Sequence, residues 1–233
     1  MKKNILFASL LALAAPIVLT SCSDDESEGR SRITYYAILE MNGDAYVTSP
    51  LGQAFSDPGC VATMAGEDVS DQVVTTGNVN TGKLGFYTVN YKVTNPDGFS
   101  ASASRTVAVV DKNNFASTYY GESQYGTRHY YHAPITIVDN GDGTYTINDL
   151  AGGFYSYGRY PGYDAYGYDF FLEAILKLNP DNTVEVVEQG HKNSWYWEDP
   201  FEDIKTTYDP ATGTITFDMD FGSANRFYVT LTK

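Results

Sequence analysis

The sequence predicts an all-β protein with two domains, an N-terminal β-sandwich followed by an antiparallel meander or barrel. Three observations favour this class. Aromatic residues make up 15% of the 233 residues, and 20 of them are Tyr and 12 are Phe, types that prefer strands. Short runs of alternating apolar and polar residues recur along the chain. Clusters of Gly, Pro, Asn and Asp separate these runs, as turns separate strands.

The first 21 residues have the pattern of a secretory signal peptide. Two lysines precede the apolar run 5–18, which is shorter than the roughly 20 residues that span a bilayer. The segment Leu19-Thr20-Ser21-Cys22 then places a small residue directly before a cysteine, and it resembles the bacterial lipobox. The resemblance implies removal of residues 1–21 and attachment of lipid to Cys22. The alternative is an ordinary signal peptide with a chance cysteine.

Residues 22–32 read as a solvated tether, because they carry four acidic side chains and no apolar residue after the cysteine. Acidic residues in this place resemble the surface-export signal of lipoproteins in Bacteroidetes. The resemblance implies a protein anchored in the outer membrane and exposed at the cell surface. A hydrophilic spacer would have the same composition, so both interpretations stay open.

The chain carries a formal net charge of −14, which excludes one class of partner. Such a surface repels phosphate backbones, and we expect no nucleic-acid partner. Only one other cysteine, Cys60, is present, so a lipid on Cys22 leaves it without a disulfide partner. Its apolar neighbours and the lack of a nearby base favour a buried structural thiol over a nucleophile.

Residues 33–111 are predicted to form the sandwich. Residues 87–93 alternate as a half-buried strand, Asn95-Pro96-Asp97-Gly98 forms a tight turn, and 105–110 returns as the partner strand. The domain resembles a bacterial immunoglobulin-like domain. The matching segments are Asp57-Pro58-Gly59 with Ala62, Gly77 to Thr81, Gly85 to Tyr91, and Arg105 to Asp111. The resemblance implies a spacer or platform without catalytic residues.

Residues 112–233, beginning with the hinge 112–114, are predicted to form the second domain. Asn140-Gly141-Asp142-Gly143 marks a hairpin, and further turns fall at 179–182 and 209–213. The segment 170–178 suits a strand or a short helix, and its length favours a strand. The expected strands are 135–139, 144–148, 170–178, 184–188, 214–221 and 226–233.

These segments follow one another through hairpin-length links, which predicts an up-and-down meander closed or nearly closed into a barrel. The layout resembles a calycin-like barrel. Together, the two domains resemble a family of Bacteroidetes surface lipoproteins, a resemblance that implies no particular activity.

The segment 154–171 is the strongest candidate for a binding site. It interleaves six tyrosines with Gly, Pro, Asp and Arg, and a loop of this composition cannot bury every ring. Exposed rings can cover the C–H face of a sugar while charged groups bond to its hydroxyls. Trp195 and Trp197 form a second cluster. The candidate glycan-binding residues are Tyr157, Arg159, Tyr160, Tyr163, Asp164, Tyr166, Trp195 and Trp197. The alternative is that these rings plug a barrel end.

No catalytic or metal-binding signature is evident. His129 and His132 would point to opposite faces of a strand, and residues 139–143 suit a hairpin better than a calcium loop. A glycosidase would have to use the acids at 198–199 and 202–203, which read as a solvated loop. We therefore expect a non-enzyme with no metal and no cofactor.

The predicted function is that of a non-catalytic, glycan-binding accessory of an outer-membrane polysaccharide uptake system. Its expected partners are the outer membrane, through the lipid anchor, a glycan, and components of an outer-membrane importer. The alternative is a structural or accessory lipoprotein that binds another protein, and a glycosidase is less favoured.

Overall fold

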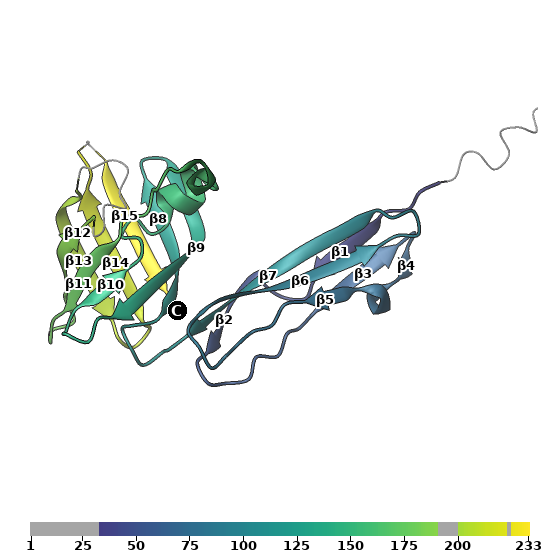
Figure 1. Ribbon diagram of the computed structural model, residues 1–233, viewed down its shortest axis with the longest axis horizontal. Coiled ribbons are helices and arrows are strands. Elements are labelled where there is room, and N and C mark those ends of the chain that lie inside the picture. Colours follow the sequence, from purple (N-terminus) through teal and green to yellow (C-terminus); the bar gives the residue numbers. More distant parts are fainter. Residues whose placement is uncertain (1–32, 191–199, 223–224) are drawn as a thin grey trace, which may run out of the picture. The chain divides into compact units, whose positions relative to one another are not determined.

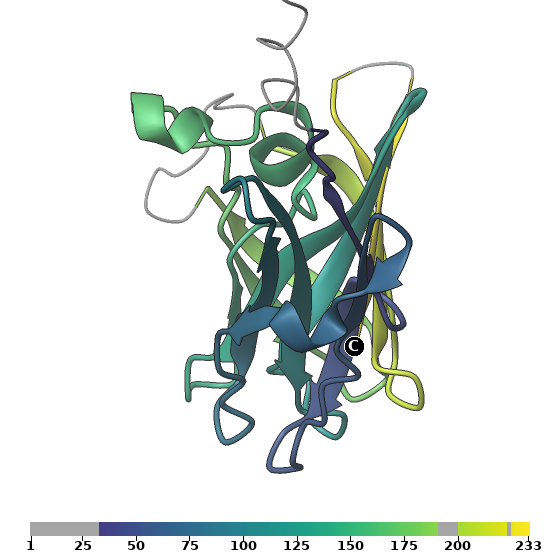
Figure 2. The same ribbon diagram turned by 90° about the vertical axis from the view of Figure 1, so that its right-hand side faces the viewer.

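A computed structural model describes residues 33–190, 200–222 and 225–233, and Figures 1 and 2 show it in two views. These ranges are mostly β-structure. The strands are β1 (Ala37–Met41), β2 (Tyr46–Pro50), β3 (Cys60–Met64), β4 (Glu67–Asp68), β5 (Val74–Thr76), β6 (Gly85–Thr94), β7 (Ser100–Val110), β8 (Thr118–Tyr125), β9 (Arg128–Asp139), β10 (Tyr145–Ile147), β11 (Ala174–Leu178), β12 (Val184–Gln189), β13 (Glu202–Asp209), β14 (Thr214–Asp220) and β15 (Arg226–Thr232). The helical turns are η2 (Ser70–Gln72), η3 (Phe154–Arg159) and η4 (Tyr163–Tyr166). In the described ranges, no helix has the length and apolar character needed to span a bilayer.

The N-terminal domain is the predicted sandwich. One sheet has the order β1-β3-β4 and the other the order β2-β7-β6-β5, with β2 parallel to β7. Strand β6 alternates as expected, because Val89, Tyr91 and Val93 are buried while the residues between them are exposed. The free thiol of Cys60 lies in β3 and is half-buried rather than fully buried.

A buried arginine joins three segments of this domain. Arg105 in β7 has no exposed surface, and its guanidinium pairs with Asp57 and bonds to the Tyr91 hydroxyl at 2.8 Å. Its Nε and Nη2 donate to the carbonyl oxygens of Asp44 at 2.9 Å and Asn42 at 2.5 Å. A buried charge whose nitrogens all have hydrogen-bond partners is tolerated, whereas one that has lost its partner is strongly destabilising.

The C-terminal domain is an eight-stranded antiparallel sheet with the order β12-β11-β10-β9-β8-β15-β14-β13. The first and last strands of this domain, β8 and β15, pair along their length, with Tyr125 opposite Phe227 and Tyr120 opposite Thr232. The sheet therefore curls into the predicted barrel, which is nearly closed (Figure 1). Its seam lies between β12 and β13, two strands that are consecutive in the chain.

Side chains bridge this seam in place of a backbone ladder. The Thr206 hydroxyl donates to the carbonyl of Val184 at 2.5 Å and accepts from its N–H at 3.1 Å. The Gln189 side chain bonds in the same way to the backbone of Phe201. Two edge strands are thus protected without a further strand between them.

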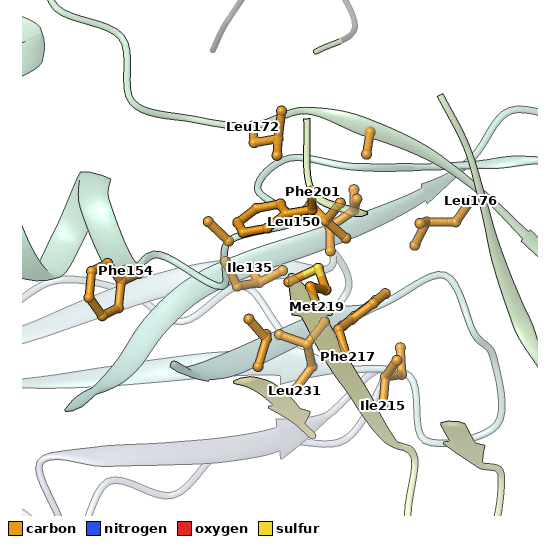
Figure 3. Close-up of a cluster of buried hydrophobic side chains, with 14 of the residues drawn as sticks. Ile135, Leu150, Phe154, Leu172, Leu176, Phe201, Ile215, Phe217, Met219 and Leu231 are labelled. Atoms are coloured by element: carbon orange, nitrogen blue, oxygen red, sulfur yellow. The ribbon is translucent and has the colours of Figure 1, made fainter. Parts of the chain in front are cut away.

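The barrel interior is filled by apolar side chains, which Figure 3 shows in close-up. Ile215, Phe217 and Met219 of β14 point inward, as their alternation predicts, and meet Ile135 of β9. Leu150 and Leu172, from the long connection between β10 and β11, pack into the same core. Eight strands enclose a space that side chains can fill. A ligand is therefore expected on the outside or at an end of the barrel.

Two predicted segments differ from the structure. The strand expected at 170–178 begins only at Ala174, because Leu172 is hydrogen-bonded to the connection instead, its carbonyl accepting from Leu150 N–H at 2.8 Å. The acids at 202–203 were expected in a solvated loop, but they begin β13. That strand lies at the edge of the sheet, where polar and charged side chains are tolerated.

Candidate functional site

The connection between β10 and β11, residues 148–173, covers one end of the barrel, and its helical turns are the green coils in Figures 1 and 2. The end of β8, the start of β9 and the start of β15 meet at this end, where Tyr125 lies opposite both Arg128 and Phe227. The turn η3 packs against β8 and β9. All candidate residues between 157 and 166 therefore lie on one structural platform.

A π-helical turn and one close backbone approach shape this platform. In η3, the N–H groups of Gly158 and Tyr160 bond to carbonyls five residues earlier, those of Gly153 and Tyr155, at 3.1 and 2.8 Å. Such turns are rare and often occur at functional sites. Gly153 has φ +80°, and a Cβ there would lie 2.2 Å from the Ala133 Cβ. Only glycine fits at this position.

Asp149 fixes the start of the connection from inside the protein. Its carboxylate has no exposed surface and accepts hydrogen bonds from the N–H groups of Ala151 at 3.0 Å, Gly153 at 3.1 Å and Leu172 at 3.3 Å. Burial raises the pKa of Asp149 to about 7, although the backbone donors act in the opposite direction. The two ends of the connection, residues 149–153 and Leu172, are thus joined through one side chain.

Part of the aromatic segment does plug the barrel end. Phe154, Tyr155 and Phe170 are buried, and Phe154 contacts the rings of Phe227 and Tyr130 with centroid distances of 5.0 Å. For these three rings the packing interpretation holds.

The other rings face solvent. Tyr157, Tyr163, Tyr166 and Tyr168 are exposed, and Tyr166 retains 77% of its accessible surface. These rings extend the buried cluster toward solvent, since the ring centroid of Tyr163 lies 6.1 Å from that of Phe170 and 6.2 Å from that of Tyr168. The segment therefore combines buried anchors with an exposed aromatic surface, so both interpretations of its tyrosines apply, each to different rings.

Tyr160 is half-buried and stacks on two rings. Its centroid lies 4.8 Å from that of Phe170 and 6.4 Å from that of Tyr155, with nearly parallel planes. Its hydroxyl accepts a hydrogen bond from Arg159 Nε at 2.9 Å. Tyr160 therefore packs within the platform and contributes its edge and hydroxyl to the surface.

Two hollows flank Tyr160. The first, the tyrosine hollow, has a volume of about 180 Å³ and is lined by Ser156, Tyr157, Tyr160, Pro161, Gly162, Asp164, Tyr168, Phe170 and Phe171. Within the described part of the chain, the Asp164 carboxylate makes no hydrogen bond or ion pair. Exposed rings beside a free carboxylate suit a polar ligand with an apolar face, because rings cover C–H surface and the carboxylate accepts from hydroxyls.

The second hollow, the arginine cleft, has a volume of about 220 Å³. Its lining residues are Tyr125, Arg128, Phe154, Tyr155, Arg159, Tyr160 and Phe221. Sequence reasoning singled out Arg159 and Tyr160 but missed Arg128, Tyr125 and Phe221. No local pattern joins these three to the aromatic segment, because only the strand order of the barrel brings them together.

Several sequence candidates lie outside the described residues. These are Cys22, Trp195, Trp197, Glu198 and Asp199. The other two acids considered for a glycosidase begin β13. Asp203 pairs with Arg226 at 2.7 Å, and this contact, with Lys205, lowers its pKa. A general acid needs a raised pKa, so the surroundings of Asp203 do not suit that role.

The two histidines occupy separate surroundings. His129 Nε2 lies 2.7 Å from Glu122 Oε1, whereas His132 stacks on Tyr46 with a centroid distance of 4.2 Å. Across the described ranges, no group of three or more His, Cys, Asp or Glu side chains is placed to hold a metal ion.

Comparison with known families divides the chain into two parts. The model of the family described as bacterial surface protein, Ig-like domain, matches residues 39–109. The model of the BT2262-like C-terminal domain matches residues 109–233. No match was found among curated proteins.

Among solved structures, the lipoprotein BT2262 from Bacteroides thetaiotaomicron is similar in both sequence and fold. It is 28% identical to this chain, with a TM-score of 0.53, and the match covers 85% of this chain and 100% of that one. The CBM51-2 and INT domains of ZmpB from Clostridium perfringens, in complex with GlcNAc, match at 14% identity, over 84% of this chain and 43% of that one. Their TM-score of 0.29 is too low to indicate a shared fold.

Proposed function

The chain belongs to the BT2262-like family, and on this premise we propose that it is a surface lipoprotein that binds glycan without catalysis. The observation that carries the proposal is the exposed part of the aromatic platform. Tyr157 and Tyr168 line a hollow together with the free carboxylate of Asp164, at a barrel end whose interior is filled. Rings and an acceptor at such spacing match the alternating apolar and hydroxylated faces of a sugar.

The geometry of the platform favours a chain-like ligand over a small buried one. The tyrosine hollow, at about 180 Å³, is smaller than the roughly 300–1,000 Å³ of sites that enclose a drug-sized molecule. Tyr163 and Tyr166 extend the surface beyond it, with their ring centroids 6.1 Å apart. A single sugar ring fits the hollow, and neighbouring rings of the same glycan would lie across these tyrosines.

The proposed location is the outer membrane, with the domains facing outward. The lipobox-like segment ending at Cys22 and the acidic tether support this, as does the similarity of the first domain to a bacterial surface protein family. A role beside an outer-membrane polysaccharide importer follows as the finer proposal, because a tethered binder without a catalytic site is useful where captured glycan is handed on.

Binding to a panel of polysaccharides tests the proposal. The soluble chain from Ser23 onward is run through affinity gels containing each glycan, followed by the variants Tyr157→Ala and Tyr163→Ala. Truncating a stacked ring should weaken binding about 5- to 150-fold, or roughly 1–3 kcal/mol. Tyr228→Ala is the matched control, because Tyr228 on β15 is 47% exposed and Tyr163 is 44% exposed. Trp195 and Trp197, the chain's two tryptophans, give an independent fluorescence signal.

If no glycan retards the wild type, or if Tyr228→Ala weakens binding as much as Tyr163→Ala, the proposal is wrong. The second candidate is then a lipoprotein that binds another protein. One observation favours it: Ile38 of β1 and Val61 of β3 are exposed on the same face of the first sheet, where Ile38 pairs with Thr63 and Val61 with Glu40.

A further inference from the structure

The arginine cleft differs in charge from the rest of the protein. The whole chain has 29 acidic and 15 basic residues, yet both charged side chains that line this cleft are arginines. Arg128 begins β9 and Arg159 ends η3. The packing of η3 against β9 therefore places two positive charges from separate parts of the sequence around one hollow.

Neither guanidinium is neutralised by an acid in the described part of the chain. The Arg128 guanidinium makes no hydrogen bond or ion pair there, and the Arg159 guanidinium makes only the hydrogen bond from Nε to the Tyr160 hydroxyl. Arg105 and Arg226 behave differently, since Arg105 pairs with Asp57 and Arg226 pairs with Asp218 at 2.6 Å. The cleft arginines thus keep their Nη donors for another partner.

The cleft also holds Arg159 against an aromatic ring. The Arg159 guanidinium lies over the Tyr160 ring, 5.2 Å from its centroid, which restrains it before any ligand binds. Burial raises the pKa of Tyr155, while the charges of Arg159 and Arg128 oppose that rise, so both guanidinium groups act on the same hydroxyl. Phe154 and Phe221 complete the apolar part of the lining.

We propose that the arginine cleft binds an anionic substituent, a carboxylate or a sulfate, carried on a sugar ring. Arginine donors match the paired oxygens of such groups, and the aromatic walls cover the C–H face of the ring. The volume of about 220 Å³ suits one such ring. This inference rests on the proposed function and specifies its substrate class: the glycan is acidic. A chain of net charge −14 would otherwise repel such a polymer.

Two matched pairs of polymers test the inference. Affinity gels contain either polygalacturonate or the same polymer after reduction of its carboxyl groups, and dextran sulfate is compared with dextran in the same way. The soluble chain from Ser23 onward should bind one anionic polymer at least 10-fold more tightly than its neutral counterpart. The pair that shows the difference identifies the substituent as carboxylate or sulfate.

The arginines are then replaced singly, as Arg128→Gln and Arg159→Gln. Each change should weaken binding to the preferred anionic polymer about 10- to 100-fold and leave binding to its neutral counterpart unchanged. Lys177→Gln, on the exposed side of β11, removes the same charge outside the cleft and is the control. Thermal unfolding, monitored by circular dichroism, establishes that each variant is folded. If Arg159→Gln does not fold, Arg159→Lys is used instead, because it retains the charge but loses the paired donors.

The outcomes separate the two proposals. Equal affinity for each anionic polymer and its neutral counterpart, or equal losses in Lys177→Gln and the cleft variants, overturns the anionic site but leaves glycan binding intact. Loss of all glycan binding in the wild type overturns both. Anion preference that disappears in the two cleft variants alone supports the site.

Discussion

The side chain of Gln189 pairs with the backbone of Phe201 as a strand residue would. Its Nε2 donates to the Phe201 carbonyl at 2.8 Å, and its Oε1 accepts from the Phe201 N–H at 2.9 Å. At the other end of the seam, Thr206 does the same for Val184. Two side chains thus supply four of the hydrogen bonds that a continuous ladder between β12 and β13 would have made.

Replacing Gln189 by Ala should loosen this seam. The change leaves the N–H and C=O of Phe201 without their partners beside a buried ring, so the free energy of unfolding should fall by about 1–3 kcal/mol. Denaturant titration measures it. Gln124→Ala is the control, because Gln124 is exposed on β8 and should change stability by less than about 0.5 kcal/mol. Equal effects of the two variants would contradict a closing role for Gln189.

Two glycines with the same φ allow the cost of backbone strain to be measured apart from the cost of a steric clash. Gly153 and Gly162 both have φ +80°, but a Cβ at Gly153 would meet Ala133 at 2.2 Å whereas one at Gly162 would meet no atom within 4 Å. Gly162→Ala should therefore cost about 1–2 kcal/mol, the strain alone. Gly153→Ala should cost roughly 3 kcal/mol or more, because the turn must also move away from β9. Thermal unfolding of the two variants compares them, and similar losses would show that the contact is relieved without cost.

Asp149 should make stability depend on pH. Its folded pKa of about 7 lies above the value of roughly 3.9 in an unfolded chain, so the folded state binds the proton more tightly. This contribution is complete below about pH 4 and is lost as the pH rises to about 7, at up to roughly 1.4 kcal/mol per pH unit. As the pH rises across that window, the free energy of unfolding of the wild type should fall relative to that of Asp149→Asn. A stability difference that stays constant between about pH 4 and about pH 7 would contradict this prediction.

Lipid attachment is predicted at Cys22. Cells that express the full chain should incorporate labelled palmitate, and Cys22→Ala should abolish incorporation, because the thiol is the attachment site implied by Leu19-Thr20-Ser21-Cys22. Cys60→Ala is the control, since it removes the only other thiol and should leave labelling unchanged. Labelling that persists without Cys22 would contradict the assignment.

Local patterns predicted much of the fold. The hairpin at 140–143 forms as expected, with Asn140 N–H bonded to the Thr144 carbonyl at 3.1 Å, because Asn-Gly and Asp-Gly strongly favour tight turns from local backbone preference alone. The alternation of β14 gives its buried face directly. Strand β13 was not predicted, because it is an edge strand in which no residue is fully buried and apolar residues are few.

The candidate site was predictable only in part. Its composition identified the aromatic segment, but which rings are buried depends on contacts with distant strands. Phe154 is buried because it packs against the rings of Tyr130 and Phe227, and Arg128 lies near Arg159 because η3 packs against β9. The π-helical turn depends on the space left beside Ala133, which no local pattern records.

The pairing of β8 with β15 brings the start and the end of this domain to one end of the barrel and leaves the connection 148–173 at the other. The chain enters the barrel at Thr118 and completes the last strand at Thr232, which lies opposite Tyr120, so both events occur at one end. The connection 148–173 lies at the other end, where it interrupts no ladder. Exchanges at its exposed positions, such as Tyr163 and Tyr166, interrupt no ladder and remove no buried side chain. The chemistry of the exposed surface at this end can thus vary while the framework stays constant, as in scaffolds whose variable loops are grouped at one end.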